Sequence, residues 1–142
     1  MIDDRPIERL QNPSRHVLIC EDDLSAAAAV LFHFTSVFPS QGRVRLSVVS
    51  SGRAAAAVVE KDKAACVVLD YDMPDGDGMY LLHWMGLCRV TDVPVITSSG
   101  LASNNQKLAD ACTLRQIPFF LCSKFGVAQG LADEFIKGVC GV

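Results

Sequence analysis

The sequence lacks any long hydrophobic segment, and this absence excludes a transmembrane helix. None of the apolar runs in its 142 residues approaches the roughly 20 residues that a membrane-spanning helix requires. The N-terminus also lacks the pattern of a signal peptide, because Asp3 and Asp4 stand where a secretory leader carries basic residues. We therefore expect a cytoplasmic protein that does not insert into a membrane.

A basic run and a Cys-x-x-Cys pair are missing as well. The 13 Lys and Arg residues are outnumbered by 16 Asp and Glu residues, and a net charge of −3 argues against a nucleic-acid partner. The six cysteines lie partly in apolar runs, so we expect free thiols that pack as small hydrophobic side chains in a reducing compartment. The three histidines have no ligand-like neighbours in the sequence, which argues against a zinc site.

Half of the residues are hydrophobic, which is typical of a globular chain with one core. Residues 1–14 are polar and carry two prolines, so we interpret them as an N-terminal tail before a single domain at 15–142. Short apolar runs then alternate with helical patterns. Strands are predicted at 17–20, 44–49, 66–69, 94–96 and 119–122, and helices at 24–38, 52–61, 78–88, 102–115 and 127–137. This order predicts an α/β, doubly wound (flavodoxin-like) five-stranded parallel sheet with helices on both faces.

Charged and hydroxyl side chains follow the predicted strands at the points where they end. Right-handed crossovers place the carboxyl ends of all parallel strands at one edge of the sheet. The residues at these ends are Glu21, Asp22 and Asp23 after the first strand, Asp70 and Asp72 after the third, Ser99 after the fourth and Lys124 after the fifth. Clustered carboxylates repel one another, and Mg²⁺ is the cation that such hard oxygen ligands suit. With Asp70 as nucleophile and Ser99 and Lys124 as partners of a phosphoryl oxygen, the pattern predicts phosphoryl transfer.

Residues 15–138 resemble the receiver domain of two-component response regulators. The resemblance is carried by Leu18–Asp23, by Leu69–Pro74 with Asp77-Gly78, by Val93–Ile96 with Ser99-Gly100, and by Lys124. It implies that Asp70 accepts a phosphoryl group from a sensor histidine kinase or a phosphotransfer protein. It also implies that Ser99 and Lys124 hold the phosphoryl oxygens. The Mg²⁺ ligands that it implies are Asp22 directly, Glu21 through water, Asp70, and the backbone carbonyl of Asp72.

The same resemblance implies a downstream protein partner that docks on the last helix and the strand beside it. We expect a single-domain regulator with no output domain after Val142, which signals by partner docking or by phosphate relay. We do not expect an enzyme in its own right, because a receiver assists only its own phosphotransfer and autodephosphorylation.

The chain departs from the family pattern at four positions around the predicted site. Phe125 follows the lysine where relatives have proline, and Leu121 stands where they often carry a switching aromatic residue. Gly100 replaces a commoner alanine and is expected to loosen its loop, while Asp72 adds a negative charge beside the acceptor. The usual relay from hydroxyl to aromatic residue cannot operate unaltered here. A receiver-like docking module that works without phosphorylation is therefore the alternative function.

Other interpretations of the acidic motif fit less well. Asp70-x-Asp72 is also typical of haloacid-dehalogenase phosphatases, but their motif lies near the N-terminus, whereas a complete strand–helix–strand–helix unit precedes it here. A calcium loop fails because Leu81 occupies the place of the bidentate glutamate. The acids at 21–23 can also cap the first helix. Among three consecutive hydroxyl residues at 97–99, counting from Pro94 favours Ser99.

Overall fold

A computed structural model describes residues 15–38 and 43–142; the predicted tail at 1–14 lies outside the described residues, as does Pro39, the residue that follows the helix predicted at 24–38. The strands are β1 (Arg15–Cys20), β2 (Val44–Val49), β3 (Cys66–Leu69), β4 (Val95–Thr97) and β5 (Phe119–Phe120). The helices are α2 (Leu24–Val37), α3 (Gly52–Lys61), α4 (Gly78–Leu87), α5 (Ala102–Leu114), α6 (Lys124–Ala128) and α7 (Asp133–Cys140).

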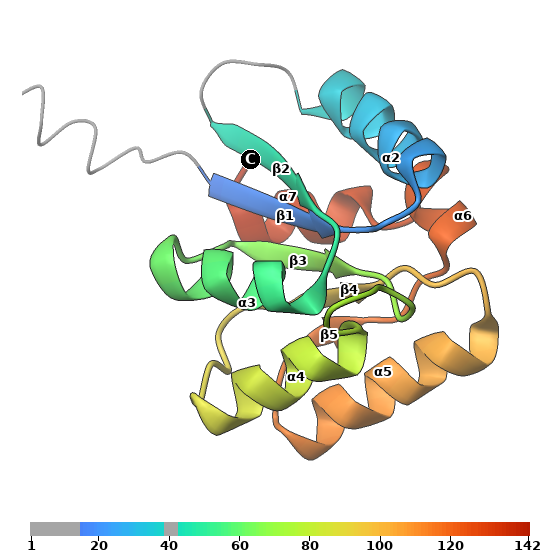
Figure 1. The fold of residues 1–142 in the computed structure, drawn as a ribbon. Coiled ribbons are helices and arrows are strands. Elements are labelled where there is room, and N and C mark those ends of the chain that lie inside the picture. The colour runs from blue at the N-terminus through green and yellow to red at the C-terminus, as the bar shows by residue number, and fades with distance from the viewer. Residues whose placement is uncertain (1–14, 39–42) are drawn as a thin grey trace, which may run out of the picture.

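The five strands form one parallel sheet in the order β2-β1-β3-β4-β5, with α2, α6 and α7 on one face and α3, α4 and α5 on the other (Figure 1). Successive side chains of a strand point to opposite faces, so each strand serves two cores. In β1, Leu18 and Cys20 join the core under α3, α4 and α5, whereas Val17 and Ile19 join the core under α2 and α7. The predicted doubly wound α/β fold is confirmed.

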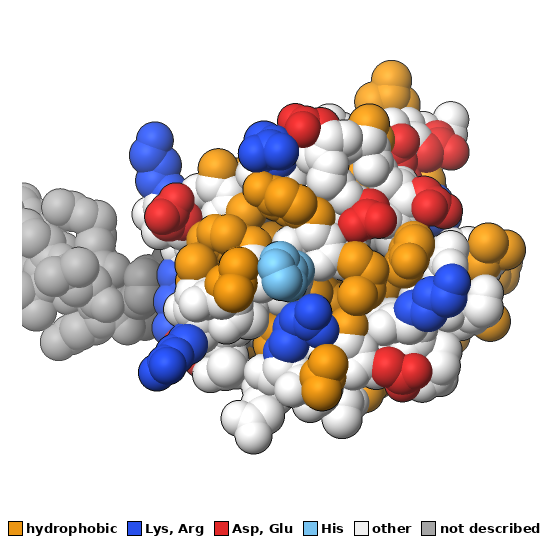
Figure 2. Space-filling model, turned by 60° about the horizontal axis from the view of Figure 1, so that its bottom comes forward, with side chains coloured by type: hydrophobic (Ala, Val, Ile, Leu, Met, Phe, Trp, Pro, Cys, Tyr) orange, Lys and Arg blue, Asp and Glu red, His pale blue; other side chains and the backbone are white. Residues whose placement is uncertain are grey.

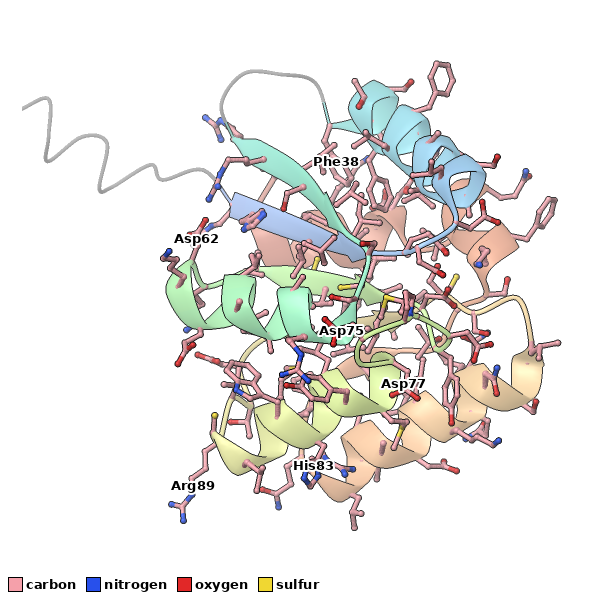
Figure 3. All side chains as sticks on the ribbon, in the orientation of Figure 1. Phe38, Asp62, Asp75, Asp77, His83 and Arg89 are labelled. Carbon is pink, nitrogen blue, oxygen red and sulfur yellow. The ribbon has the colours of Figure 1, made fainter. Side chains whose placement is uncertain are left out.

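Four of the helices begin at a polar side chain that accepts a backbone N–H of the first turn. The capping residues are Asp23 for α2, Ser51 for α3, Asp77 for α4 and Ser123 for α6. Figure 3 shows Asp77 at the start of α4. Because these residues follow a strand or the loop after it, each cap marks the residue at which the helix begins.

The fifth strand is shorter than predicted. It comprises Phe119 and Phe120 only, because beyond them a side chain replaces the backbone ladder. The Thr97 hydroxyl donates to the Cys122 carbonyl (2.6 Å) and accepts the Cys122 N–H (2.7 Å). An isolated parallel bridge between Ser99 and Ser123 then continues the alignment of the two segments that follow β4 and β5.

The prediction of one helix at 127–137 is wrong, since the structure has two helices, α6 and α7, in this region. Gly130 adopts a φ of 92°, a conformation that favours glycine. The Gly130 N–H donates to the Val127 carbonyl (3.1 Å), and the next N–H, of Leu131, donates to the Gly126 carbonyl (2.9 Å). This pair of bonds is the Schellman arrangement that ends a helix, so the chain reorients before α7 begins.

Part of the hydrophobic content lies on the surface. Figure 2 shows the outer face of α4 and α5, where hydrophobic side chains alternate with charged ones around a histidine, and Leu87 and Leu114 of these helices are exposed. Five of the six cysteines, by contrast, are buried. Within the described residues, no helix combines the length and the apolar character that crossing a membrane would demand.

His16 makes the fold sensitive to acid. It lies in β1, only 4% exposed, with Nε2 2.5 Å from the Ser47 hydroxyl. Burial, followed by the charge of Arg45, lowers the pKa of His16, and the weaker attraction of Asp62 does not offset these effects. Because the unfolded chain then binds the proton more readily, the contribution of His16 to stability is lost as the pH falls below about 6.5.

We expect the urea midpoint of the protein to fall less steeply between pH 7 and pH 5 in His16→Gln than in the unaltered protein. Comparing the two proteins cancels the titration of every other group. Parallel pH profiles would show that His16 is not the acid-sensitive group.

Candidate functional site

Three carboxylates meet at the carboxyl edge of the sheet. Glu21 and Asp22 follow β1, Asp70 follows β3, and these strands are neighbours; one oxygen from each residue lies within 4.8 Å of the others. Glu21 and Asp70 are each 4% exposed, whereas Asp22 is exposed at the mouth of the group. Asp23, the next acid, points elsewhere: it caps α2 by accepting the N–H groups of Ser25 (2.9 Å) and Ala26 (3.3 Å).

Lys124, the first residue of α6 after β5, brings a positive charge to these carboxylates. Its Nζ lies 3.1 Å from Glu21 Oε1 and 3.5 Å from Asp70 Oδ2. Partial burial lowers the pKa of Lys124, but the hydrogen bond to Glu21 and the charge of Asp70 outweigh it and hold that pKa above its usual value. The ammonium group therefore stays charged beside the two buried acids.

Asp70 is an acid with an altered protonation equilibrium. Burial, followed by the charge of Glu21, raises the pKa of Asp70 to about 6, although Lys124 and the Tyr71 N–H lower it. The Tyr71 N–H donates to Oδ1 (2.8 Å), while Oδ2 faces Lys124. The carboxylate thus has a fixed orientation, and its charge calls for a further cation.

The donor set fits Mg²⁺. Three carboxylates, whose oxygens are hard ligands, lie together, and Asp22 opens the group to solvent. Among the residues that the structure describes, Lys124 is the one lysine that pairs with them. Glu21, Asp22 and Asp70 could hold the ion. The side chain of Asp72 is exposed and is not part of this carboxylate group, so the role predicted for its backbone carbonyl stays a prediction.

Ser99 lies at the same edge, beyond β4. It is buried, and its hydroxyl accepts the N–H of Leu101 (3.2 Å), which leaves the hydroxyl proton for another acceptor. Its carbonyl accepts the backbone N–H of Lys124 (3.0 Å). Thr97, by contrast, uses its hydroxyl on the backbone of Cys122. Of these two hydroxyls, that of Ser99 is the one with a proton to offer.

The supporting roles of two residues, Gly78 of the acceptor-loop motif and Asn105, were not predicted from the sequence. A Cβ at Gly78 would lie 2.5 Å from the backbone oxygen of Asp70, so glycine permits the close approach of α4 to the acceptor residue. Asn105, in the first turn of α5, bonds the backbone of Ser99 with both ends of its side-chain amide. The one sign in the sequence was Asn104-Asn105, a polar pair that is unfavourable within a helix but suits a structural hydrogen bond.

The loop between β3 and α4 is tied to the start of α3. The Gly52 N–H donates to the Gly76 carbonyl (2.5 Å), and the Arg53 guanidinium donates to Asp75 (3.0 Å) while lying 5.2 Å from the Tyr80 ring centre. Figure 3 shows Asp75 between α3 and α4. These contacts fix the loop that carries the chain away from Asp70.

The sequence matches one known family model. Residues 17–117 match the model of the response regulator receiver domain. No curated protein sequence matches the chain.

Solved structures with the same fold are receiver domains at low sequence identity. One is described as the signal receiver domain of a LuxO repressor from Vibrio parahaemolyticus, with 22% identity, a TM-score of 0.68, and coverage of 89% of this chain and 92% of that one. A Francisella response regulator receiver domain has 20% identity and a TM-score of 0.66, with coverage of 90% and 98%. The receiver domain of a sensor histidine kinase from Pseudomonas aeruginosa, with a magnesium ion coordinated in its active-site cleft, has 18% identity and a TM-score of 0.67, with coverage of 91% and 99%.

Proposed function

The chain belongs to the response regulator receiver domain family of two-component signalling, and on this premise we propose that Asp70 accepts a phosphoryl group from a histidine kinase or a phosphotransfer protein with the help of Mg²⁺. The phosphorylated domain then signals by docking on a protein partner or by passing the phosphoryl group on.

One observation carries this proposal: the carboxylates of Glu21, Asp22 and Asp70 converge, and the Lys124 ammonium lies 3.5 Å from Asp70 Oδ2. A purely structural cluster would gain nothing from collecting three acids with one base, because like charges repel and buried carboxylates are costly. A site that binds a divalent cation and a phosphoryl group needs this balance of charges.

Asp70 acts as the nucleophile. One of its carboxylate oxygens bonds to phosphorus while the P–N bond of the donor phosphohistidine breaks; the imidazole nitrogen keeps the electron pair of that bond and takes up a proton. The product on Asp70 is an acyl phosphate. Lys124 pairs with a phosphoryl oxygen, and Ser99 donates its hydroxyl proton to another.

A bound Mg²⁺ would supply charge neutralisation between the carboxylates and the incoming phosphoryl oxygens. Asp22 and Asp70 would hold the ion directly and Glu21 through water, and the backbone carbonyl of Asp72 would be a further ligand. The domain assists its own phosphorylation and the later hydrolysis of the acyl phosphate, and it turns over no other substrate.

Intact-mass measurement after incubation with acetyl phosphate and Mg²⁺ tests the proposal. We expect a mass increase of one phosphoryl group that hydroxylamine removes, that EDTA prevents, and that disappears in Asp70→Asn. Asp72→Asn is the matched control: it removes a neighbouring carboxylate but leaves the acceptor, and it should keep the adduct.

Failure of both acetyl phosphate and a phosphohistidine donor to produce an adduct, together with no Mg²⁺ binding, would overturn the proposal in favour of a docking module that works without phosphorylation. Hydrolysis of added phosphate esters with turnover would contradict the statement that the domain is not an enzyme.

A further inference from the structure

We infer that Asn105 is the positioning residue that couples the phosphoryl-binding groups Ser99 and Lys124 to helix α5 and to the groove beside it. This inference rests on the proposed phosphorylation of Asp70. It concerns how occupancy of that site is transmitted, in a chain where Leu121 replaces the aromatic residue expected to do so.

Both ends of the Asn105 side-chain amide hydrogen-bond to the backbone of Ser99. Its Oδ1 accepts the N–H of Ser99 (2.7 Å) and its Nδ2 donates to the carbonyl of Ser99 (3.0 Å). The side chain is only 4% exposed, so neither bond can be replaced cheaply by water. Two bonds from one planar group fix orientation as well as distance, and Ser99 cannot shift without drawing Asn105 with it.

The same carbonyl also fixes Lys124. The oxygen of Ser99 accepts from both Asn105 Nδ2 (3.0 Å) and the backbone N–H of Lys124 (3.0 Å). One acceptor therefore holds both residues proposed to bind the phosphoryl oxygens and connects them to the first turn of α5.

The start of α5 depends on Ser99 in return. Leu101 occupies the N-cap position, and no side chain caps this helix end. The Leu101 N–H instead donates to the Ser99 hydroxyl (3.2 Å). When Ser99 moves toward a phosphoryl oxygen, its hydroxyl proton goes to that oxygen while the hydroxyl oxygen keeps the Leu101 N–H. The Asn105 amide, which holds the Ser99 backbone, carries that movement into the helix.

Asn105 also reaches the surface side of the domain. It lines a groove of about 520 Å³ between α5, β5 and the start of α7, together with Leu121 and Leu131. Leu121 is 51% exposed and contributes an aliphatic side chain to the wall of this groove. The movement of Asn105 thus changes the wall of this groove without an aromatic switch.

The test follows amide resonances in the unaltered protein and in Asn105→Ala when Mg²⁺ and beryllofluoride, a stand-in for the phosphoryl group, are added. In the unaltered protein we expect shifts at Tyr71 and Lys124, at the Asn105 side-chain amide, and at Ala102 and Leu121. In Asn105→Ala, the shifts at Tyr71 should remain, and those at Ala102 and Leu121 should fall by at least half. Exchange of the Ser99 amide with solvent should quicken at least tenfold.

Asn104→Ala is the control, because Asn104 is a buried neighbour on the same turn and leaves the bonds to Ser99 intact. It should keep all the shifts. Equal responses at Ala102 and Leu121 in Asn105→Ala and in the unaltered protein would overturn the inference. If Asn105→Ala does not fold, a stationary Asn105 side-chain resonance in the unaltered protein, with Tyr71 and Lys124 shifting, would overturn it as well. No shift at Tyr71 in the unaltered protein would instead overturn the proposed function itself.

Discussion

Asp70→Asn is expected to make the Mg²⁺-free protein more stable at pH 8, although it abolishes the proposed phosphorylation. The buried carboxylate has a pKa of about 6, against an ordinary value of 3.8. For an acid whose pKa is raised on folding, stability is present at low pH and is lost as the pH rises through that window. At about 1.4 kcal/mol for each pKa unit, the ionised Asp70 costs the folded state about 1–3 kcal/mol, which asparagine avoids.

Urea denaturation in EDTA at pH 8 and at pH 5 measures this effect. The advantage of Asp70→Asn should shrink at pH 5, where Asp70 of the unaltered protein is mostly protonated. Asp72→Asn serves as the control: its side chain is exposed, so we expect a change within about 0.5 kcal/mol. A less stable Asp70→Asn would mean that the attraction of Lys124 outweighs burial and the charge of Glu21.

The same pair of proteins reports on the cation. A ligand that binds only the folded state stabilises it by about 1.4 kcal/mol at a concentration of tenfold its Kd. Mg²⁺ should therefore stabilise the unaltered protein more than Asp70→Asn, which has lost one carboxylate of the donor set. Equal stabilisation of both would place the ion elsewhere.

Gly78→Ala is expected to have the opposite effect on the fold, a loss of about 1–3 kcal/mol. The new Cβ would lie 2.5 Å from the Asp70 carbonyl oxygen and 3.0 Å from Leu108 Cδ2. The first of these atoms is backbone and cannot turn aside as a side-chain tip can. Either α4 or the residue that carries the acceptor carboxylate has to move, so formation of the phosphoryl adduct should also slow.

Gly138→Ala provides a control with the opposite sign. Gly138 lies within α7, and a Cβ there would meet no atom within 4 Å. Alanine in an open helix position is worth about 0.5–1 kcal/mol over glycine, so this variant should be more stable and should phosphorylate normally. Equal stability of Gly78→Ala and the unaltered protein in urea denaturation would show that the backbone around Asp70 yields without cost.

Local patterns were sufficient for most of the fold. Runs such as Val67–Leu69 are buried on both faces, so they are continuous in the sequence and cannot be confused with amphipathic helices. The pattern was insufficient at Gly130, because a glycine inside a helical periodicity gives no sign of whether the chain continues or turns. It was insufficient at the end of β5 as well, since at Cys122 the Thr97 hydroxyl, 25 residues away in the sequence, takes over the hydrogen bonds of the ladder.

Local patterns predicted that Glu21, Asp22, Asp70, Ser99 and Lys124 follow strands of a parallel sheet, since apolar runs and breakers are local properties. How these residues meet depends on the order of the strands in space. The strand order makes β1 and β3 neighbours, which brings the three carboxylates within 4.8 Å, and the ends of β4 and β5 are joined through Ser99. The roles of Asn105 and Gly78 depend on contacts across the fold, and no pattern of neighbouring residues encodes a contact of that kind.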